Sequence, residues 1–130
     1  MILLDTNVVS EPLKLTGDVG VLNWIDAQSI ETLYLSTISL AEMRFGIAAL
    51  PSGKRRDTLH ASLEQRILPL FVGRILPFDE AASEAYAKLR ANARAQGQAI
   101  ASADGYIAAT ALSQGLMVAT RDISPFEAAG

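Results

Sequence analysis

Four acidic residues stand at positions where carboxylates could act together. Asp5 directly follows the apolar run at residues 2–4, and Asp122 follows the apolar run that ends at Ala119. Glu42 and Asp104 each lie near the start of a predicted helix. In an open parallel sheet the ligand crevice lies at the carboxyl ends of the strands. We therefore expect four carboxylates to converge on one pocket: Asp5, Glu42, Asp104 and Asp122.

Such a cluster requires positive charge. Two carboxylates about 4 Å apart repel by roughly 4 kcal/mol at an effective dielectric constant near 20. A cluster must therefore raise its pKa values or bind cations, and no lysine stands beside any of the four acids. All-oxygen ligands favour Mg²⁺ or Mn²⁺ over zinc. These ions generate hydroxide and stabilise charge on oxygen, which suits hydrolysis of phosphate esters.

Each acid also has a structural interpretation. Ser39-Leu-Ala-Glu42 matches a capping box, in which Glu42 would only satisfy a helix end. Asp104 in a first helical turn would stabilise the helix by about 0.3–1 kcal/mol through its interaction with the helix dipole. Asp122 could cap the segment that follows it, and Asp5 could begin a turn. The argument for chemistry depends on the four acids together.

Two uncharged residues are candidates for orienting the acids. Asn7 and Thr120 could position a metal-bound water or hold a carboxylate by a hydrogen bond. Their structural interpretations are turn formation for Asn7 and ordinary strand propensity for Thr120.

The elements that must position these residues alternate between strand and helix. Short apolar runs predict strands at 2–4, 33–35, 74–76 and 116–119. Helical periodicity and caps predict helices within 7–15, from Gly17-Asp18, from Ser36 or Ser39 to Leu50, and over 54–68, 79–97 and 102–114. The alternation favours an α/β three-layer sandwich with a mainly parallel sheet of four or five strands.

Composition narrows the classes of protein. The chain has 130 residues, which fit one domain over residues 1–130. It has no cysteine and one histidine, so disulfides, thiolate zinc sites and cysteine nucleophiles are excluded. The net charge of −3 and the pI near 5.0 exclude nucleic-acid binding driven by global positive charge. Mean hydropathy is +0.25, but no apolar run reaches the length of a membrane span, and no signal peptide is present, so we expect a cytoplasmic protein.

Four motifs together resemble the signature of PIN domains, in particular the VapC-type toxins of the FitB-like branch. They are Met-Ile-Leu-Leu-Asp5-Thr6-Asn7, Leu40-Ala-Glu42, Ala103-Asp104-Gly-Tyr-Ile-Ala and Ala119-Thr120-Arg121-Asp122. The resemblance implies a PIN-like α/β/α fold and a metal-dependent endoribonuclease toxin whose acidic residues are Asp5, Glu42, Asp104 and Asp122. It also implies a further strand after Asp122, for which residues 124–130 carry no signal.

The resemblance also implies partners. A cognate antitoxin would hold the toxin inactive and would itself bind operator DNA. We expect RNA as the substrate, a homodimer, and no membrane. Because an acidic pocket attracts cations, we expect an antitoxin segment to bring an arginine or lysine to the Asp5/Glu42/Asp104 cluster.

Three alternatives stay open at this stage. A receiver-like phosphoacceptor would also place an aspartate after its first strand, with Asp79 after the third; however, Asp79 suits a helix cap, and no lysine follows the last strand. A haloacid-type hydrolase requires Asp-x-Asp, where this chain has Asn7. The third alternative is a non-catalytic subunit that binds an antitoxin and, through it, DNA.

Repulsion among the acids predicts the effect of Asp104→Asn. In metal-free protein the substitution should raise the melting temperature, because it removes one charge from the cluster. Thermal unfolding in the presence of a chelator measures this. A clear loss of stability would instead favour a purely helix-stabilising Asp104.

Overall fold

The computed structural model describes residues 1–121 and contains a four-stranded parallel sheet in the order β3-β2-β1-β4. The strands are β1 (Ile2–Leu4), β2 (Leu33–Ser36), β3 (Ile75–Leu76) and β4 (Met117–Ala119). β1 lies at the centre, with Leu4 in register with Leu35 on one side and with Ala119 on the other. The four strands confirm the predicted positions and the parallel arrangement.

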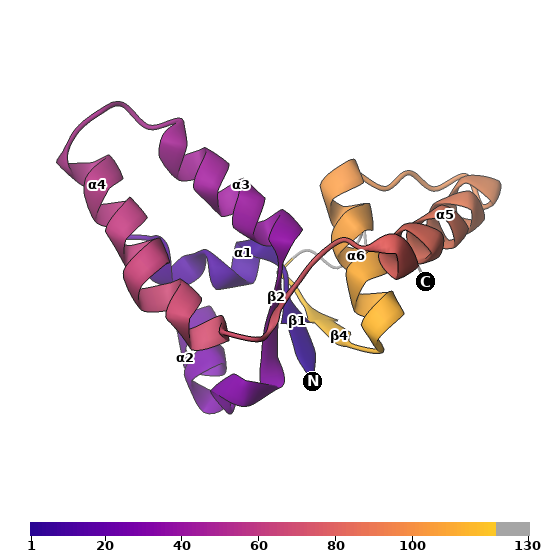
Figure 1. Cartoon of the computed structure of the whole chain (residues 1–130), viewed down its shortest axis with the longest axis horizontal. Helices are drawn as coiled ribbons and strands as arrows, with labels where there is room; N and C mark the ends of the chain where they lie inside the picture. Colours follow the sequence, from indigo (N-terminus) through magenta and orange to yellow (C-terminus); the bar gives the residue numbers. More distant parts are fainter. Residues whose placement is uncertain (122–130) are drawn as a thin grey trace.

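Helices cover both faces of this sheet (Figure 1). The α-helices are α1 (Thr6–Val9), α2 (Val19–Ala27), α3 (Thr37–Ala48), α4 (Lys54–Ala61), α5 (Glu80–Ala95) and α6 (Ser102–Gln114). Shorter helical segments are η1 (Glu11–Leu13), η2 (Ile30–Thr32), η3 (Ser62–Ile67) and η4 (Leu68–Phe71). Helices α1 to α4 lie on one side and the α5–α6 pair on the other, which is the predicted three-layer sandwich.

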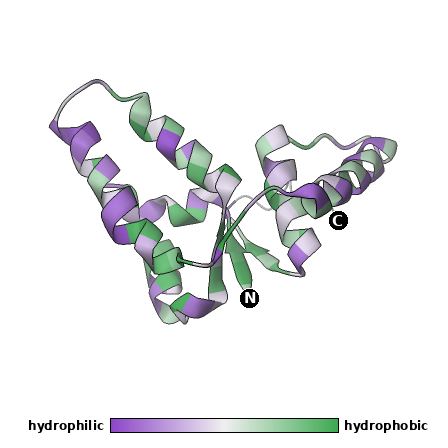
Figure 2. Ribbon diagram, viewed as in Figure 1, coloured by the Kyte–Doolittle hydropathy of each residue, from purple (hydrophilic) through white to green (hydrophobic). Residues whose placement is uncertain are grey.

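The central strand is buried on both faces. Leu4 is 1% exposed and packs with the residues of α1, α3 and η3, whereas Leu3 is 0% exposed and packs with Ile107 of α6. Successive strand residues point to opposite faces, so a wholly apolar strand suits a sheet covered by helices twice. Figure 2 shows the strands as hydrophobic and the outer side of α4 as largely hydrophilic.

Side-chain caps define where three helices begin. Asp18, Ser36 and Asp79 each accept a hydrogen bond from the backbone N–H three residues later, at 3.0, 3.0 and 2.9 Å. These bonds satisfy N–H groups that the first helical turn leaves free. Gly115, with φ of +67°, ends α6 in the left-handed conformation that glycine adopts at no steric cost. The predictions of helix starts at Asp18 and Asp79 and of a helix over 102–114 are confirmed.

Some predictions were wrong in detail. The helix expected within 7–15 is divided into α1 and the 3-10 segment η1, because Pro12 has no N–H with which to continue an α-helix. The helix expected over 54–68 changes at Ser62 into the π-helical η3, and then into η4. The capping box at Ser39 is wrong, because Ser36 is the N-cap of α3 and Ser39 lies inside the helix. The question of a further strand falls on residues 122–130, outside the described residues.

No helix within residues 1–121 is both long enough and apolar enough to cross a membrane.

One ion pair ties α3 to η3 and predicts a dependence of stability on pH. Arg44 donates two hydrogen bonds to the Glu64 carboxylate, at 2.8 and 3.1 Å. This bonding to Arg44 lowers the pKa of Glu64 below its ordinary value of 4.5, although partial burial opposes the shift. A lowered pKa contributes stability above pH 4.5, and that stability is lost as the pH falls through the folded-state value.

Glu64→Gln should therefore lower the free energy of unfolding by about 0.5–1 kcal/mol at pH 7. The difference from wild type should shrink as the pH falls below 4.5. Urea unfolding between pH 7 and pH 3 measures this. Glu84→Gln is the matched control, since Glu84 pairs with Lys88 at 3.6 Å on an exposed helix surface and should show almost no effect. A constant difference at all pH values would contradict the ion-pair interpretation.

Candidate active site

Asp5 links the end of β1 to the start of α1. Its Oδ1 accepts a hydrogen bond from the Thr6 backbone N–H at 2.8 Å, so Asp5 is the N-cap of α1. Its Oδ2 accepts a hydrogen bond from the Thr120 hydroxyl at 2.8 Å. Its own N–H donates to the carbonyl of Ala119 at 2.9 Å, and the residue is only 5% exposed. The carboxylate is therefore held in one orientation by uncharged donors.

Asn7 and Thr120 meet at the same edge of the sheet. Thr120 directly follows β4, the parallel neighbour of β1. Asn7 Nδ2 donates to Thr120 Oγ1 at 3.4 Å, and Asn7 Oδ1 accepts from the Arg121 backbone N–H at 3.1 Å. The Asn7 side chain thus joins α1 to the chain that leaves β4.

Glu42 is exposed on α3 and is oriented by Thr6. The Thr6 hydroxyl oxygen lies 2.6 Å from Glu42 Oε1 and 2.9 Å from Ser39 Oγ. A hydroxyl has one proton, and a carboxylate can only accept, so Thr6 donates to Glu42 and accepts from Ser39. Glu42 therefore contacts α1 and does not close a capping box on its own helix. Sequence reasoning missed Thr6 because its partners are 33 and 36 positions away.

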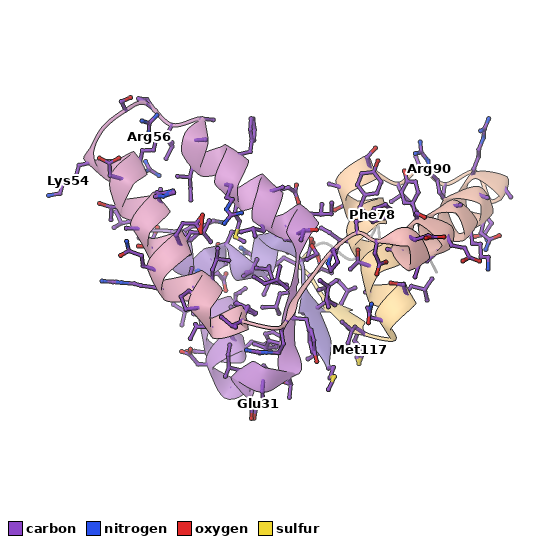
Figure 3. The ribbon with its side chains drawn as sticks, viewed as in Figure 1. Glu31, Lys54, Arg56, Phe78, Arg90 and Met117 are labelled. Carbon is purple, nitrogen blue, oxygen red and sulfur yellow. The ribbon has the colours of Figure 1, made fainter. Side chains whose placement is uncertain are left out.

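Asp104 lies in the first turn of α6 and is partly buried. Two residues later, the Tyr106 ring contacts the Phe78 ring, with 4.9 Å between centroids. Phe78 comes two residues after β3, at the carboxyl edge of the sheet, whereas Met117 begins β4 at the opposite edge (Figure 3). Helix α6 also packs against α3, the helix that carries Glu42.

The structure places two of the four predicted acids beside one residue, Thr6. Asp5 and Glu42 both contact Thr6, while Asp122 lies outside the described residues. Within residues 1–121, no three His, Cys, Asp or Glu side chains lie close enough to hold a metal ion together. The four-carboxylate metal site therefore stays a prediction.

A further acid, Glu11, is buried beside this edge, and the sequence analysis did not identify it. Its side chain is 2% exposed and forms ion pairs with Lys14 at 2.6 Å and with Arg121 at 2.5 Å. The pKa of Glu11 lies below its ordinary value, chiefly because Glu11 is bonded to Lys14. Burial acts in the opposite direction, while the Asp18 N–H and the charge of Arg121 lower the pKa further. Glu11 stands between Ser10 and Pro12, and nothing in this short polar segment of the sequence indicates a buried anion.

Comparison with known proteins identifies the family. A family model described as the PIN domain matches residues 2–130, and the chain belongs to this family. It is 62% identical over 130 residues to VapC ribonuclease Y4jK of Sinorhizobium fredii, covering 100% of this chain and 93% of that protein. It is 55% identical over 129 residues to Toxin FitB of Neisseria gonorrhoeae, covering 99% of this chain and 93% of that protein.

Solved structures agree with this assignment. The fold matches a structure titled "Crystal Structure of FitAcB from Neisseria gonorrhoeae" with a TM-score of 0.95 and 55% identity, covering 99% of this chain and 93% of that chain. The resemblance to PIN domains and to VapC and FitB toxins, and the three-layer fold that it implied, are therefore confirmed.

The contact between Thr6 and Ser39 predicts a non-additive effect of two substitutions. Thr6→Val should lower the free energy of unfolding by about 1–2 kcal/mol, because it leaves the buried Ser39 hydroxyl without its partner. In the Thr6→Val background, Ser39→Ala should cost much less than it costs in wild type. Chemical unfolding of the four proteins of this double-mutant cycle measures the coupling.

Thr58→Val, at an exposed position of α4, is the control and should change stability little. Additive effects of Thr6→Val and Ser39→Ala would contradict the contact.

Proposed function

We propose that this chain is a metal-dependent endoribonuclease and the toxin of a toxin–antitoxin pair. Membership of the PIN family and 62% identity to a protein named VapC ribonuclease support the ribonuclease class. The observation that carries the proposal is the Asp5 carboxylate, which is buried yet, within residues 1–121, bonded only to neutral donors.

The chemistry of the Asp5 and Glu42 carboxylates suits a hard divalent cation. Among the described residues, each oxygen of Asp5 accepts one hydrogen bond, and a carboxylate oxygen has a second lone pair with which it can bind a cation. Within residues 1–121 no ion pair includes Asp5 or Glu42, so neither charge is neutralised there. Oxygen ligands favour Mg²⁺ or Mn²⁺. We propose that four carboxylates would hold the ion: Asp5, Glu42, Asp104 and Asp122.

When bound, the ion would lower the pKa of a water molecule and stabilise the charge that develops on the phosphate and the leaving oxygen. The chain's own residues orient the acids. Thr120 and the Thr6 N–H fix the two oxygens of Asp5, and the Thr6 hydroxyl fixes one oxygen of Glu42. Because Asp5 is buried and Glu42 is exposed, RNA would approach from the side of α3.

The proposal extends to partners. A structure titled "Structure of FitAB bound to IR36 DNA fragment" matches this chain with a TM-score of 0.95 and 54% identity. By analogy, we propose that a cognate antitoxin inhibits this chain and carries it to operator DNA, while the toxin acts on RNA in the cytoplasm. An arginine or lysine of the antitoxin would compete with the cation for the charge of Asp5 and Glu42.

Asp5→Asn should abolish RNA cleavage while the protein stays folded. The amide has nearly the volume of the carboxylate but lacks its charge, so we expect a loss of at least about 100-fold in rate. The measurement is cleavage of total RNA by purified protein with Mn²⁺, with and without EDTA. A circular dichroism spectrum of each protein checks that it is folded. Glu84→Gln, at an exposed helix position, serves as the control for a lost carboxylate and should cleave like wild type.

Cleavage that persists in EDTA would contradict the metal mechanism, and an active Asp5→Asn would show that the site is misplaced. Wild-type protein that binds its antitoxin but never cleaves RNA would favour the alternative of a non-catalytic subunit.

A further inference from the structure

Glu11 is a buried anion that the proposed chemistry does not use. Removing a carboxylate from water is costly unless charged or hydrogen-bonding partners replace the lost hydration. Glu11 has three such partners: the Lys14 ammonium at 2.6 Å, the Arg121 guanidinium at 2.5 Å and the Asp18 backbone N–H at 3.3 Å. These contacts join η1, the start of α2 and the chain that follows β4, so Glu11 fixes three segments to one another.

A path of hydrogen bonds connects Glu11 to Asp5. Glu11 holds the side chain of Arg121, whose backbone N–H donates to Asn7 Oδ1 at 3.1 Å. The amide of Asn7 then donates to Thr120 Oγ1 at 3.4 Å, and Thr120 donates to Asp5 Oδ2 at 2.8 Å. The segment that positions Asp5 is therefore anchored at its far end by an ion pair.

The same ion pair determines where the positive charge of Arg121 lies. Arg121 follows Thr120 in the sequence and directly precedes Asp122, which is one of the predicted metal-binding acids. A guanidinium pairs readily with carboxylates and would compete with a metal ion for them. Glu11 instead binds Nη1, and Asp18 lies 3.5 Å from Nη2. The guanidinium is thereby drawn toward η1 and α2.

We propose that Glu11 is a positioning residue for the metal site: through its ion pair with Arg121, it anchors the chain after β4, so that Thr120 and Asn7 hold Asp5 ready for a divalent cation. This proposal rests on the function proposed above, because that function requires Asp5 to bind a metal ion. Its structural part, the anchoring of residues 119–121, concerns the metal-free protein as well.

Two measurements on the full chain test the proposal. Amide hydrogen exchange by NMR, in metal-free protein, reports whether the Arg121 N–H stays bonded to Asn7. Mn²⁺ titration followed by electron paramagnetic resonance reports the affinity of the site. The variants are Glu11→Gln, Arg121→Met and the conservative Arg121→Lys. Lys14→Gln is the matched control, because it removes the other cation bound to the same carboxylate but leaves Arg121 in place.

We expect Glu11→Gln and Arg121→Met to accelerate exchange at Arg121 and to weaken Mn²⁺ binding by about tenfold or more. Arg121→Lys should restore most of the affinity, and Lys14→Gln should leave both readouts near wild type. Arg121→Met also covers the case in which Glu11→Gln does not fold, because the Arg121 side chain is 40% exposed and its loss is better tolerated.

Three results would overturn the proposal. Unchanged exchange in Arg121→Met would show that the ion pair anchors nothing, whatever the protein does to RNA. Faster exchange with unchanged Mn²⁺ affinity would separate the anchor from the metal site. Equal weakening by Lys14→Gln would assign the effect to general destabilisation. By contrast, wild-type protein that binds no Mn²⁺ and cleaves no RNA, but shows the expected exchange pattern, would refute the proposed function and the metal part of this inference while confirming the anchor.

Discussion

The burial of the Asp5 carboxylate at the carboxyl end of the central strand is the constraint on which the rest of this edge depends. A carboxylate that is 5% exposed must find hydrogen-bond donors inside the protein. The first donor is available because α1 begins directly after Asp5: the backbone N–H of Thr6, free in the first helical turn, donates to the Asp5 carboxylate. It supplies the second through the parallel register of β1 with β4, which places Thr120 beside Asp5.

The strand on the other side of β1 meets a related requirement. β2 ends at Ser36, whose buried hydroxyl caps α3 by accepting from the Ser39 N–H at 3.0 Å. This start of α3 turns the Ser39 hydroxyl toward Thr6 and brings Glu42, one turn later, to the same threonine. Thr6 thus bonds to Asp5 through its backbone and to Glu42 through its side chain, so the spacing of the two acids depends on one residue of α1.

The sequence predicted the features that depend on near neighbours. The apolar strand before Asp5 and the caps at Asp18 and Asp79 each involve residues within four positions, where composition and periodicity carry the signal. The contact of Thr6 with Glu42 spans 36 positions, and that of Arg121 with Glu11 spans 110. Such contacts can be inferred only once the order of the strands in the sheet is known. The capping box at Ser39 was wrong for the same reason, since the end of β2 decides that Ser36 begins the helix.

The distribution of charge around Asp5 follows from the difference between two ways of satisfying a buried carboxylate. A neutral N–H or hydroxyl donor stabilises the ionised form and leaves its charge in place, whereas a guanidinium stabilises it and cancels that charge. Within residues 1–121 the side chain of Asp5 receives neutral donors only, and Arg121, which follows Thr120 in the chain, is bound by Glu11. An ion pair whose carboxylate is buried adds little to stability by itself, because desolvation of the carboxylate offsets the attraction. Its position beside Thr120 gives it a second effect: it anchors the chain that carries Thr120, whose hydroxyl donates to the Asp5 carboxylate.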